Sequence, residues 1–207
     1  MEIQISNRRI QGRAKMKNGC ILCGGVGSGK SRTALAYYMS FCGGRIPIND
    51  DNSGIKPMEE PRDLYIITTP KKRDREEWEE EASPFRITKN PETCIHNVNL
   101  VVDSWNNIKK YTKVYGAFFI FDEQRVVGNG AWVKSFLQIT KKNKWILLSA
   151  TPGDTWMDYW AIFVANGFYK NKTDFQNQHV IFSRFAKYPK IDGYYNKGVL
   201  EKHRRDI

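Results

Sequence analysis

The chain has 207 residues, which is enough for one α/β domain with a sizeable core and too few for two domains of ordinary size. We therefore predict one domain over residues 1–207. The formal net charge of +11 at neutral pH indicates a surface that attracts polyanions, although charge alone does not separate nucleic-acid binders from other basic proteins. No apolar run approaches the roughly 20 residues of a membrane span, and residues 1–4 do not resemble a secretion signal, so we expect a soluble, cytoplasmic protein with no membrane partner.

Four cysteines lie at positions 20, 23, 42 and 94, and the first two form a C-x-x-C pair that is compatible with metal or redox chemistry. Both members of this pair fall in a predicted strand of small apolar residues, and no second Cys or His pair follows at a zinc spacing. We therefore predict that Cys20 and Cys23 are buried, reduced thiols that bind no metal.

Short apolar, β-branched or aromatic runs alternate with helical stretches along the chain, and this alternation predicts an α/β fold with a mainly parallel sheet flanked by helices. The predicted strands are residues 19–23, 64–68, 99–102, 117–121 and 145–149. Ligands of such sheets bind beyond the carboxyl ends of the strands. The residues that follow each strand are therefore the candidates for chemistry.

A glycine-rich loop follows the first predicted strand. Residues 24–31 read GGVGSGKS and fill every fixed position of the pattern G-x-x-x-x-G-K-[ST]. Glycines let the backbone wrap an anion with its N–H groups pointing inward, and the phosphates then sit at the N-terminus of the next helix. We expect Lys30 to contact the β- and γ-phosphates and the Ser31 hydroxyl to bind Mg²⁺. The alternative, a turn without a ligand, rarely supplies the Lys-Ser pair at this spacing.

The predicted nucleotide-binding residues of this loop are Gly25, Val26, Gly27, Ser28, Gly29, Lys30, Ser31 and Arg32. The following helix carries apolar residues on one face and should end at Gly43. Residues 43–62 are rich in Gly, Pro, Asn and Asp, which predicts a mobile surface loop. A highly acidic helix is expected over residues 73–82, with Trp78 as its main apolar anchor.

Aromatic residues at helical spacing over 156–163 are more typical of a core or an interface than of a platform for bases. Residues 170–198 are predicted to be irregular. The basic residues 202–205 should close a final helix.

An acidic pair follows the fourth predicted strand, where Asp122 and Glu123 come directly after the buried run Phe-Phe-Ile-Phe. Asp122 can hold Mg²⁺, and Glu123 can orient and deprotonate an attacking water. An apolar run that ends in two acids is also common at an ordinary boundary between strand and loop. Its position about 90 residues after a phosphate-binding loop favours the catalytic interpretation.

Two further segments complete a recognisable order of motifs. The second predicted strand ends in Thr-Thr-Pro-Lys at 68–71, and the fifth runs into Ser-Ala-Thr-Pro at 149–152. Together with the glycine-rich loop and Asp-Glu-Gln-Arg at 122–125, this order resembles the first RecA-like domain of superfamily two helicases over about residues 11–165. The Asp-Ser-Trp segment at 103–105 and Trp78 make it most similar to the Swi/Snf-type and phage DEAD-like members.

The resemblance implies an ATP-binding domain of a helicase or translocase, on DNA more than on RNA, that uses ATP and Mg²⁺. The residues it implies for nucleic-acid binding are Thr69, Pro70, Lys71 and Ser104. It also implies Ser149, Thr151 and Arg125 for coupling nucleotide state to strand binding, and Gln11 for reading adenine. Arg125 departs from the His, Asp or Gln that relatives typically carry.

Three alternatives remain open for these residues and for the chain. The hydroxyls of Ser149 and Thr151 could instead form a turn or an N-cap. The basic residues Lys71, Lys72, Arg73 and Arg75 could be a solvated face that pairs with the neighbouring glutamates. The chain as a whole could be a phage DNA-packaging ATPase domain or a regulatory module that binds nucleotide or DNA.

The motifs of a second RecA-like domain, which supplies the arginine finger in such helicases, are missing from the sequence. The resemblance therefore implies a second RecA-like domain as a partner, in cis or in trans, and weak ATP hydrolysis by this chain alone. A phage-encoded protein of this kind would work in the host cytoplasm.

Overall fold

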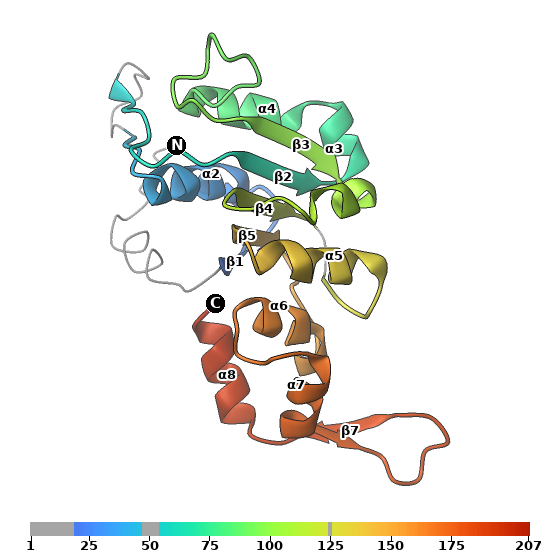
Figure 1. Ribbon diagram of the computed structural model, residues 1–207. Coiled ribbons are helices and arrows are strands. Elements are labelled where there is room, and N and C mark those ends of the chain that lie inside the picture. Colours follow the sequence, from blue (N-terminus) through green and yellow to red (C-terminus); the bar gives the residue numbers. More distant parts are fainter. Residues whose placement is uncertain (1–18, 47–53, 124–125) are drawn as a thin grey trace.

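The computed structural model describes residues 19–46, 54–123 and 126–207 (Figure 1). Its centre is a five-stranded sheet in the order β1-β5-β4-β2-β3, in which every neighbouring pair is parallel. The strands are β1 (Gly19–Cys23), β2 (Leu64–Thr68), β3 (Leu100–Ser104), β4 (Phe118–Asp122) and β5 (Lys144–Ser149). The predicted α/β class, with a mainly parallel sheet flanked by helices, is confirmed. The first two strands have the predicted bounds, and the others shift by one or two residues.

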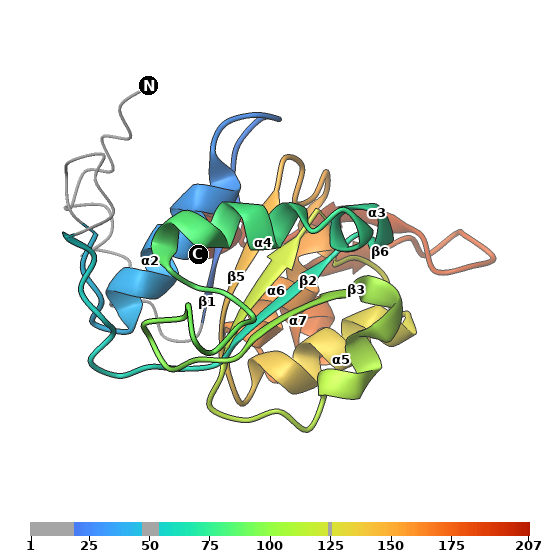
Figure 2. The ribbon, with the colours of Figure 1, turned by 90° about the horizontal axis from the view of Figure 1, so that it is seen from above.

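Helices cover both faces of this sheet (Figures 1 and 2). One face packs against α2 (Lys30–Phe41) and α4 (Glu77–Ala82), and the other against the 3-10 helix η3 (Trp105–Tyr111), α5 (Ala131–Thr140) and α6 (Trp160–Ala165). The alternation of side chains along β4 makes this division visible, because Phe118 and Ile120 join the first cluster while Phe119 and Phe121 join the second. The sheet is thus buried on both faces, as parallel sheets usually are.

The helix after the glycine-rich loop ends as predicted. Gly43 has a positive φ of 78°, and the N–H of Gly44 donates to the carbonyl of Met39 at 2.9 Å, which closes the last turn of α2. The prediction of a surface loop over 43–62 is only partly right for the residues that the structure describes. Ile55 and Met58 are buried against the α2 side of the core, so this segment is pinned by two apolar side chains.

The acidic segment is two helices and not the single helix predicted over 73–82. Thr69 accepts a hydrogen bond from the N–H of Lys72 and caps α3 (Pro70–Asp74). The chain then turns at Glu76, which has a positive φ of 56°, and α4 begins at the next residue. Trp78 is 2% exposed and is the apolar anchor of α4, as predicted.

The prediction of irregular structure over 170–198 is wrong. Asn171 caps α7 (Lys172–His179) by accepting the N–H of Asp174 at 2.9 Å, and this short polar helix leads into an antiparallel hairpin of β6 (Val180–Phe182) and β7 (Ile191–Tyr194). The predicted final helix is present as α8 (Lys197–Arg205).

The aromatic stripe before Gly167 is core, as expected. Tyr159 of the 3-10 helix η4 (Trp156–Tyr159) and Trp160 and Phe163 of α6 are buried. Phe163 lies against the rings of Tyr169 and Phe175, so the C-terminal helices pack around it. These contacts join the C-terminal segment to the same cluster as α5 and the sheet.

The two cysteines of the C-x-x-C pair differ in exposure. Cys20 is buried, as predicted, whereas Cys23 is exposed because β1 reaches the carboxyl edge of the sheet there. The prediction of a buried thiol is therefore wrong for Cys23. No disulfide joins the four cysteines, all of which lie within the described residues. No helix in the described ranges has both the length and the apolar character needed to cross a membrane.

The close approach of β1 to β5 generates a stability prediction. A Cβ added to Gly19 would lie 2.2 Å from the indole of Trp145, its register partner, and this ring is held against Phe136 in the core. We expect Gly19→Ala to lower the free energy of unfolding by about 1–3 kcal/mol, because the buried ring cannot yield. Gly198→Ala is the control, since nothing lies within 4 Å of its added Cβ. Urea unfolding that found Gly19→Ala as stable as the control would contradict this packing.

Candidate functional site

The glycine-rich loop joins the carboxyl end of β1 to the N-terminus of α2. Gly27 and Gly29 both have a φ of 75°, a backbone conformation that side chains disfavour, and Gly29 is the N-cap of α2. The Lys30 ammonium donates to the carbonyls of Gly24 and Gly25 at 2.8 and 2.6 Å, so it lies across the loop. The loop residues 25–29 are exposed, and Val26 is fully so.

The carboxylate of Asp122 receives three hydrogen bonds on a single oxygen. The donors to Oδ2 are the Thr68 hydroxyl at 2.9 Å and the Lys72 ammonium and Trp78 indole N–H, both at 3.0 Å. Asp122 is 2% exposed, and a buried carboxylate requires such partners. Its backbone carbonyl also accepts the indole N–H of Trp105 at 2.9 Å. Asp122 is thereby fixed from β2, α3, α4 and η3.

Glu123 follows Asp122 with a left-handed backbone, at a φ of 57°, which is unusual for a residue with a side chain. Its N–H donates to the carbonyl of Leu148 in β5 at 3.2 Å. Its side chain is half exposed, and Oε1 lies 2.7 Å from the Lys72 ammonium. The turn therefore places a second, accessible carboxylate beside the buried one.

Lys72 joins the two acids, and the sequence did not reveal this role. Burial alone would lower the pKa of Lys72, but the hydrogen bonds and charges of Glu123 and Asp122 outweigh it and raise the pKa above its ordinary value of 10.5. The interpretation of residues 72–75 as a solvated face that pairs with nearby glutamates is thus wrong for Lys72. Its partners lie 50 residues further along the chain.

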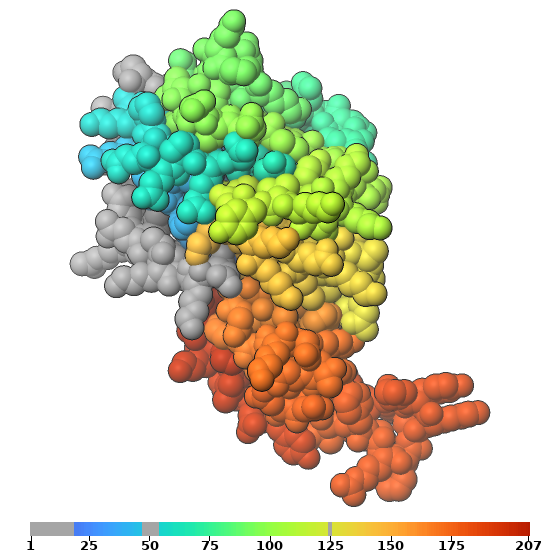
Figure 3. Space-filling view, in the orientation of Figure 1, coloured from blue at the N-terminus to red at the C-terminus, as the bar shows by residue number. Residues whose placement is uncertain are grey.

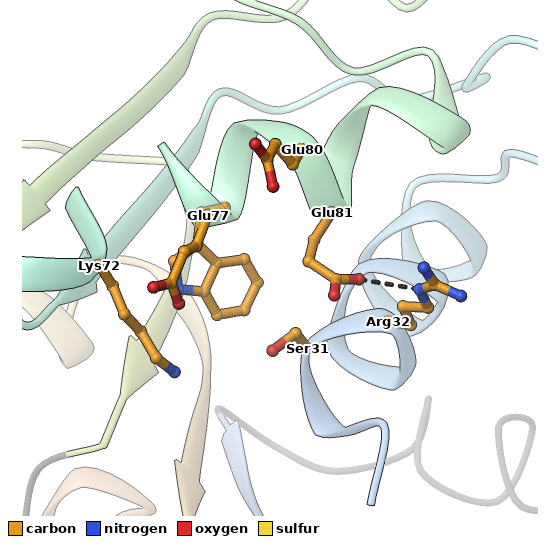
Figure 4. Close-up of a pocket in the computed structure, with 7 residues that line it drawn as sticks. Ser31, Arg32, Lys72, Glu77, Glu80 and Glu81 are labelled. Atoms are coloured by element: carbon orange, nitrogen blue, oxygen red, sulfur yellow. Dashed lines mark hydrogen bonds and ion pairs between the residues drawn. The ribbon is translucent and has the colours of Figure 1, made fainter. Parts of the chain in front are cut away.

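A polar cavity of about 260 Å³ lies between the start of α2 and the helices α3 and α4 (Figure 4). It is lined by Ser31, Arg32, Lys72, Glu77, Trp78, Glu80 and Glu81. Ser31 and Lys72 face the same space from α2 and α3, and Arg32 pairs with Glu81 at 2.9 Å. The cavity thus places the predicted magnesium ligand of α2 next to the lysine that holds Asp122.

A second polar cluster lies at the carboxyl end of β3. The Asp103 carboxylate accepts hydrogen bonds from Asn107, Tyr111 and Arg73 at 2.8, 2.6 and 3.3 Å. Burial alone would raise the pKa of Asp103, but these donors and the N–H of Ser104 lower it below its usual range. Ser104 is 1% exposed, and its hydroxyl accepts from Arg73 at 3.4 Å.

The other predicted nucleic-acid-binding residues start α3. Thr69 is its N-cap, Pro70 is its first residue and the exposed Lys71 follows. Consecutive residues of α3 therefore have different environments, because Lys71 faces solvent while Lys72 and Arg73 bind the two acidic clusters. The residues predicted to bind nucleic acid at the start of α3 therefore lie next to Lys72, which contacts Asp122.

The predicted coupling residues form a turn after β5. The hydroxyl of Ser149 accepts the N–H of Thr151 at 3.2 Å, which is the turn left open as an alternative, and Thr151 itself is exposed. Gln11 and Arg125 lie outside the described residues. Within the described ranges no group of three or more His, Cys, Asp and Glu side chains is arranged to hold a metal ion.

Comparison with known proteins finds likenesses among solved structures. No known family model matches the chain, and no curated protein matches its sequence. Among solved structures, the fold is similar to the crystal structure of the Pyrococcus furiosus Hef helicase domain, with 16% identity and a TM-score of 0.49. The match covers 85% of this chain and 40% of that one. The chain thus spans less than half of that helicase structure.

The position of Lys72 predicts a measurable contribution to stability. We expect Lys72→Met to lower the free energy of unfolding by about 1–3 kcal/mol, because Asp122 loses its charged donor while remaining buried. Lys71→Met, one residue earlier and exposed, is the control and should change stability by less than about 0.5 kcal/mol.

The pH dependence of this effect follows from the raised pKa of Lys72. A raised folded-state pKa contributes stability that is fully present below the unfolded value and is lost only as the pH rises through the folded one. The difference between Lys72→Met and wild type in urea unfolding should therefore be constant between about pH 6 and 9. Equal stability of the two methionine variants would show that the Lys72 contacts do not stabilise the fold.

Proposed function

We propose that this chain is the ATP-binding domain of a helicase or translocase that acts on DNA more than on RNA. The observation that supports this most is that Ser31, the last residue of the glycine-rich loop, lines one polar cavity together with Lys72, whose ammonium contacts both Asp122 and Glu123. The loop offers backbone N–H groups and a lysine for phosphates, and the pair offers one fixed and one accessible carboxylate.

The residues present fit a nucleotide with magnesium. Ser31 and Asp122 supply the hard oxygen ligands that Mg²⁺ prefers. Because all three donors to Asp122 share Oδ2, its Oδ1 is the oxygen that would meet the metal ion. Bound Mg²⁺ would neutralise charge on the phosphates, and Glu123 would orient the attacking water and take its proton.

The nucleic-acid part of the proposal depends on the edge of the sheet next to this cavity. Lys71 is exposed at the start of α3, and the chain carries a net charge of +11. Contacts from such a segment to phosphates carry no sequence information, which suits movement along a strand. Ser104 is buried, so its contribution would pass through Arg73.

A second RecA-like domain, in cis or in trans, is the partner that this proposal requires. A cationic finger from such a domain is worth roughly 10³ to 10⁵ in rate in related phosphoryl-transfer systems. We therefore propose that this chain alone binds ATP well and hydrolyses it slowly.

The nucleotide site is tested first by Lys30→Ala. This change removes the charge that would contact the β- and γ-phosphates but no core packing, so magnesium-ATP binding should be lost in titration calorimetry while the unfolding midpoint stays the same. Lys134→Ala, an exposed lysine of α5, is the matched control. Wild-type ATP affinity in Lys30→Ala would refute the site.

The catalytic pair is tested by Glu123→Gln. The amide keeps the shape and can still accept from Lys72, but it cannot take a proton. We expect unchanged ATP binding and a loss of hydrolysis of about 10²-fold or more in a steady-state phosphate-release assay. Asp122→Asn should instead weaken the dependence on magnesium. Hydrolysis by Glu123→Gln at the wild-type rate would assign the base elsewhere, and wild-type ATP binding without any turnover would favour a regulatory module.

A further inference from the structure

The hairpin tip, residues 183–190 between β6 and β7, projects from the body of the protein (Figures 1 and 3). Its sequence is Ser-Arg-Phe-Ala-Lys-Tyr-Pro-Lys, with three cations and no acid. Phe185 is 99% exposed and Tyr188 is 75% exposed. Two aromatic rings in water on one short loop are unfavourable unless a ligand covers them, which makes the tip a candidate binding surface.

The base of the hairpin is held firmly. Ser183 donates its N–H to the carbonyl of Lys190 at 2.8 Å, and Tyr195 donates to the carbonyl of His179 at 2.8 Å. The His179 ring lies within hydrogen-bond distance of the Tyr169 hydroxyl, at 2.6 Å, in the buried aromatic cluster around Phe163. The tip is therefore presented on a rigid support, which lowers the entropic cost of binding.

We propose that the hairpin tip is a binding site for single-stranded nucleic acid, with Phe185 and Tyr188 stacking on unpaired bases and the cations contacting phosphates. Aromatic rings among cations are the combination that single-strand binding uses, because each base has a face to stack and each nucleotide a charge to neutralise. Ala186 and Pro189 are the only aliphatic residues of the tip, which disfavours insertion into a membrane. This inference rests on the proposed action on nucleic acid.

The position of the hairpin suits this role. It points toward the same side of the molecule as α3, the side toward which β2 and β3 run, but it starts from the opposite, C-terminal end, below α5 in the view of Figure 1 (Figures 1 and 2). A strand that contacts Lys71 at the start of α3 would lie on the side of the protein toward which the tip points. The tip would then read base faces while α3 contacts the sugar-phosphate backbone.

The test uses the full chain and fluorescence anisotropy with a labelled 20-nucleotide oligothymidine and a labelled blunt duplex. Phe185→Ala combined with Tyr188→Ala should weaken binding to the single strand by about tenfold or more and leave duplex binding nearly unchanged, because only unpaired bases offer a free face. Tyr115→Ala is the control, since Tyr115 is an 82% exposed aromatic residue on another loop. Both variants change exposed side chains, and matching thermal midpoints would establish that they are folded.

A charge variant probes the phosphate contacts separately. Replacing Arg184, Lys187 and Lys190 by Gln should reduce the slope of log affinity against log salt by about 2 for the single strand. Single-strand affinity and salt slope equal to wild type in both tip variants would overturn the proposal.

A parallel Lys71→Ala variant separates this failure from failure of the proposed function. If Lys71→Ala loses nucleic-acid binding while both tip variants bind as the wild type does, the proposed nucleic-acid function stands and the tip is rejected as a binding site. Absence of DNA and RNA binding by the wild type would reject both. If the protein binds phosphatidylserine vesicles through Phe185 and does not bind DNA through it, the tip is a site for an anionic membrane and the inference is overturned.

Discussion

The buried carboxylate of Asp122 is the constraint on which the site depends. A charge removed from water must be matched by donors, and here a hydroxyl, an ammonium and an indole N–H converge on one oxygen. These donors come from β2, α3 and α4, so the position of each of these elements is tied to the same atom. The cost of burying the charge thus sets the geometry of the carboxyl edge of the sheet.

The helix α3 links the acidic pair that follows β4 to the polar cluster at the end of β3. Because it has only five residues, any rotation of the helix would move all of its side chains together. Lys72 binds Asp122 at the end of β4 and Glu123 just after it. Arg73 binds Asp103 of β3, and Lys71 faces solvent. A ligand bound to Lys71 would therefore affect the position of Lys72, which contacts Asp122 and Glu123. Such a connection gives the proposed strand-binding segment a direct physical path to the proposed catalytic pair.

The sheet could be predicted from the sequence because its strands are buried on both faces and appear as continuous apolar runs, such as Phe118 to Phe121. The partners of Lys72 could not be predicted from the sequence. Glu76 is a nearby glutamate that could pair with Lys72, whereas the residues that Lys72 contacts lie about 50 positions further along the chain. The helix α7 escaped prediction because its buried side chains are only Phe175 and His179. The break between α3 and α4 could not be predicted because the residue with the positive φ at this turn is Glu76, whereas glycine is the usual residue in that conformation.

The single hydrogen bond from the Glu123 N–H to the Leu148 carbonyl connects two motifs that are 25 residues apart. Leu148 is bonded covalently to Ser149, whose hydroxyl shapes the turn that ends at Thr151. The turn is therefore connected to Glu123 through one peptide unit and one hydrogen bond. Glu123 occupies a backbone conformation of higher energy, and its N–H is held by the last residues of β5, so the end of this strand helps to fix the direction in which the Glu123 carboxylate is presented.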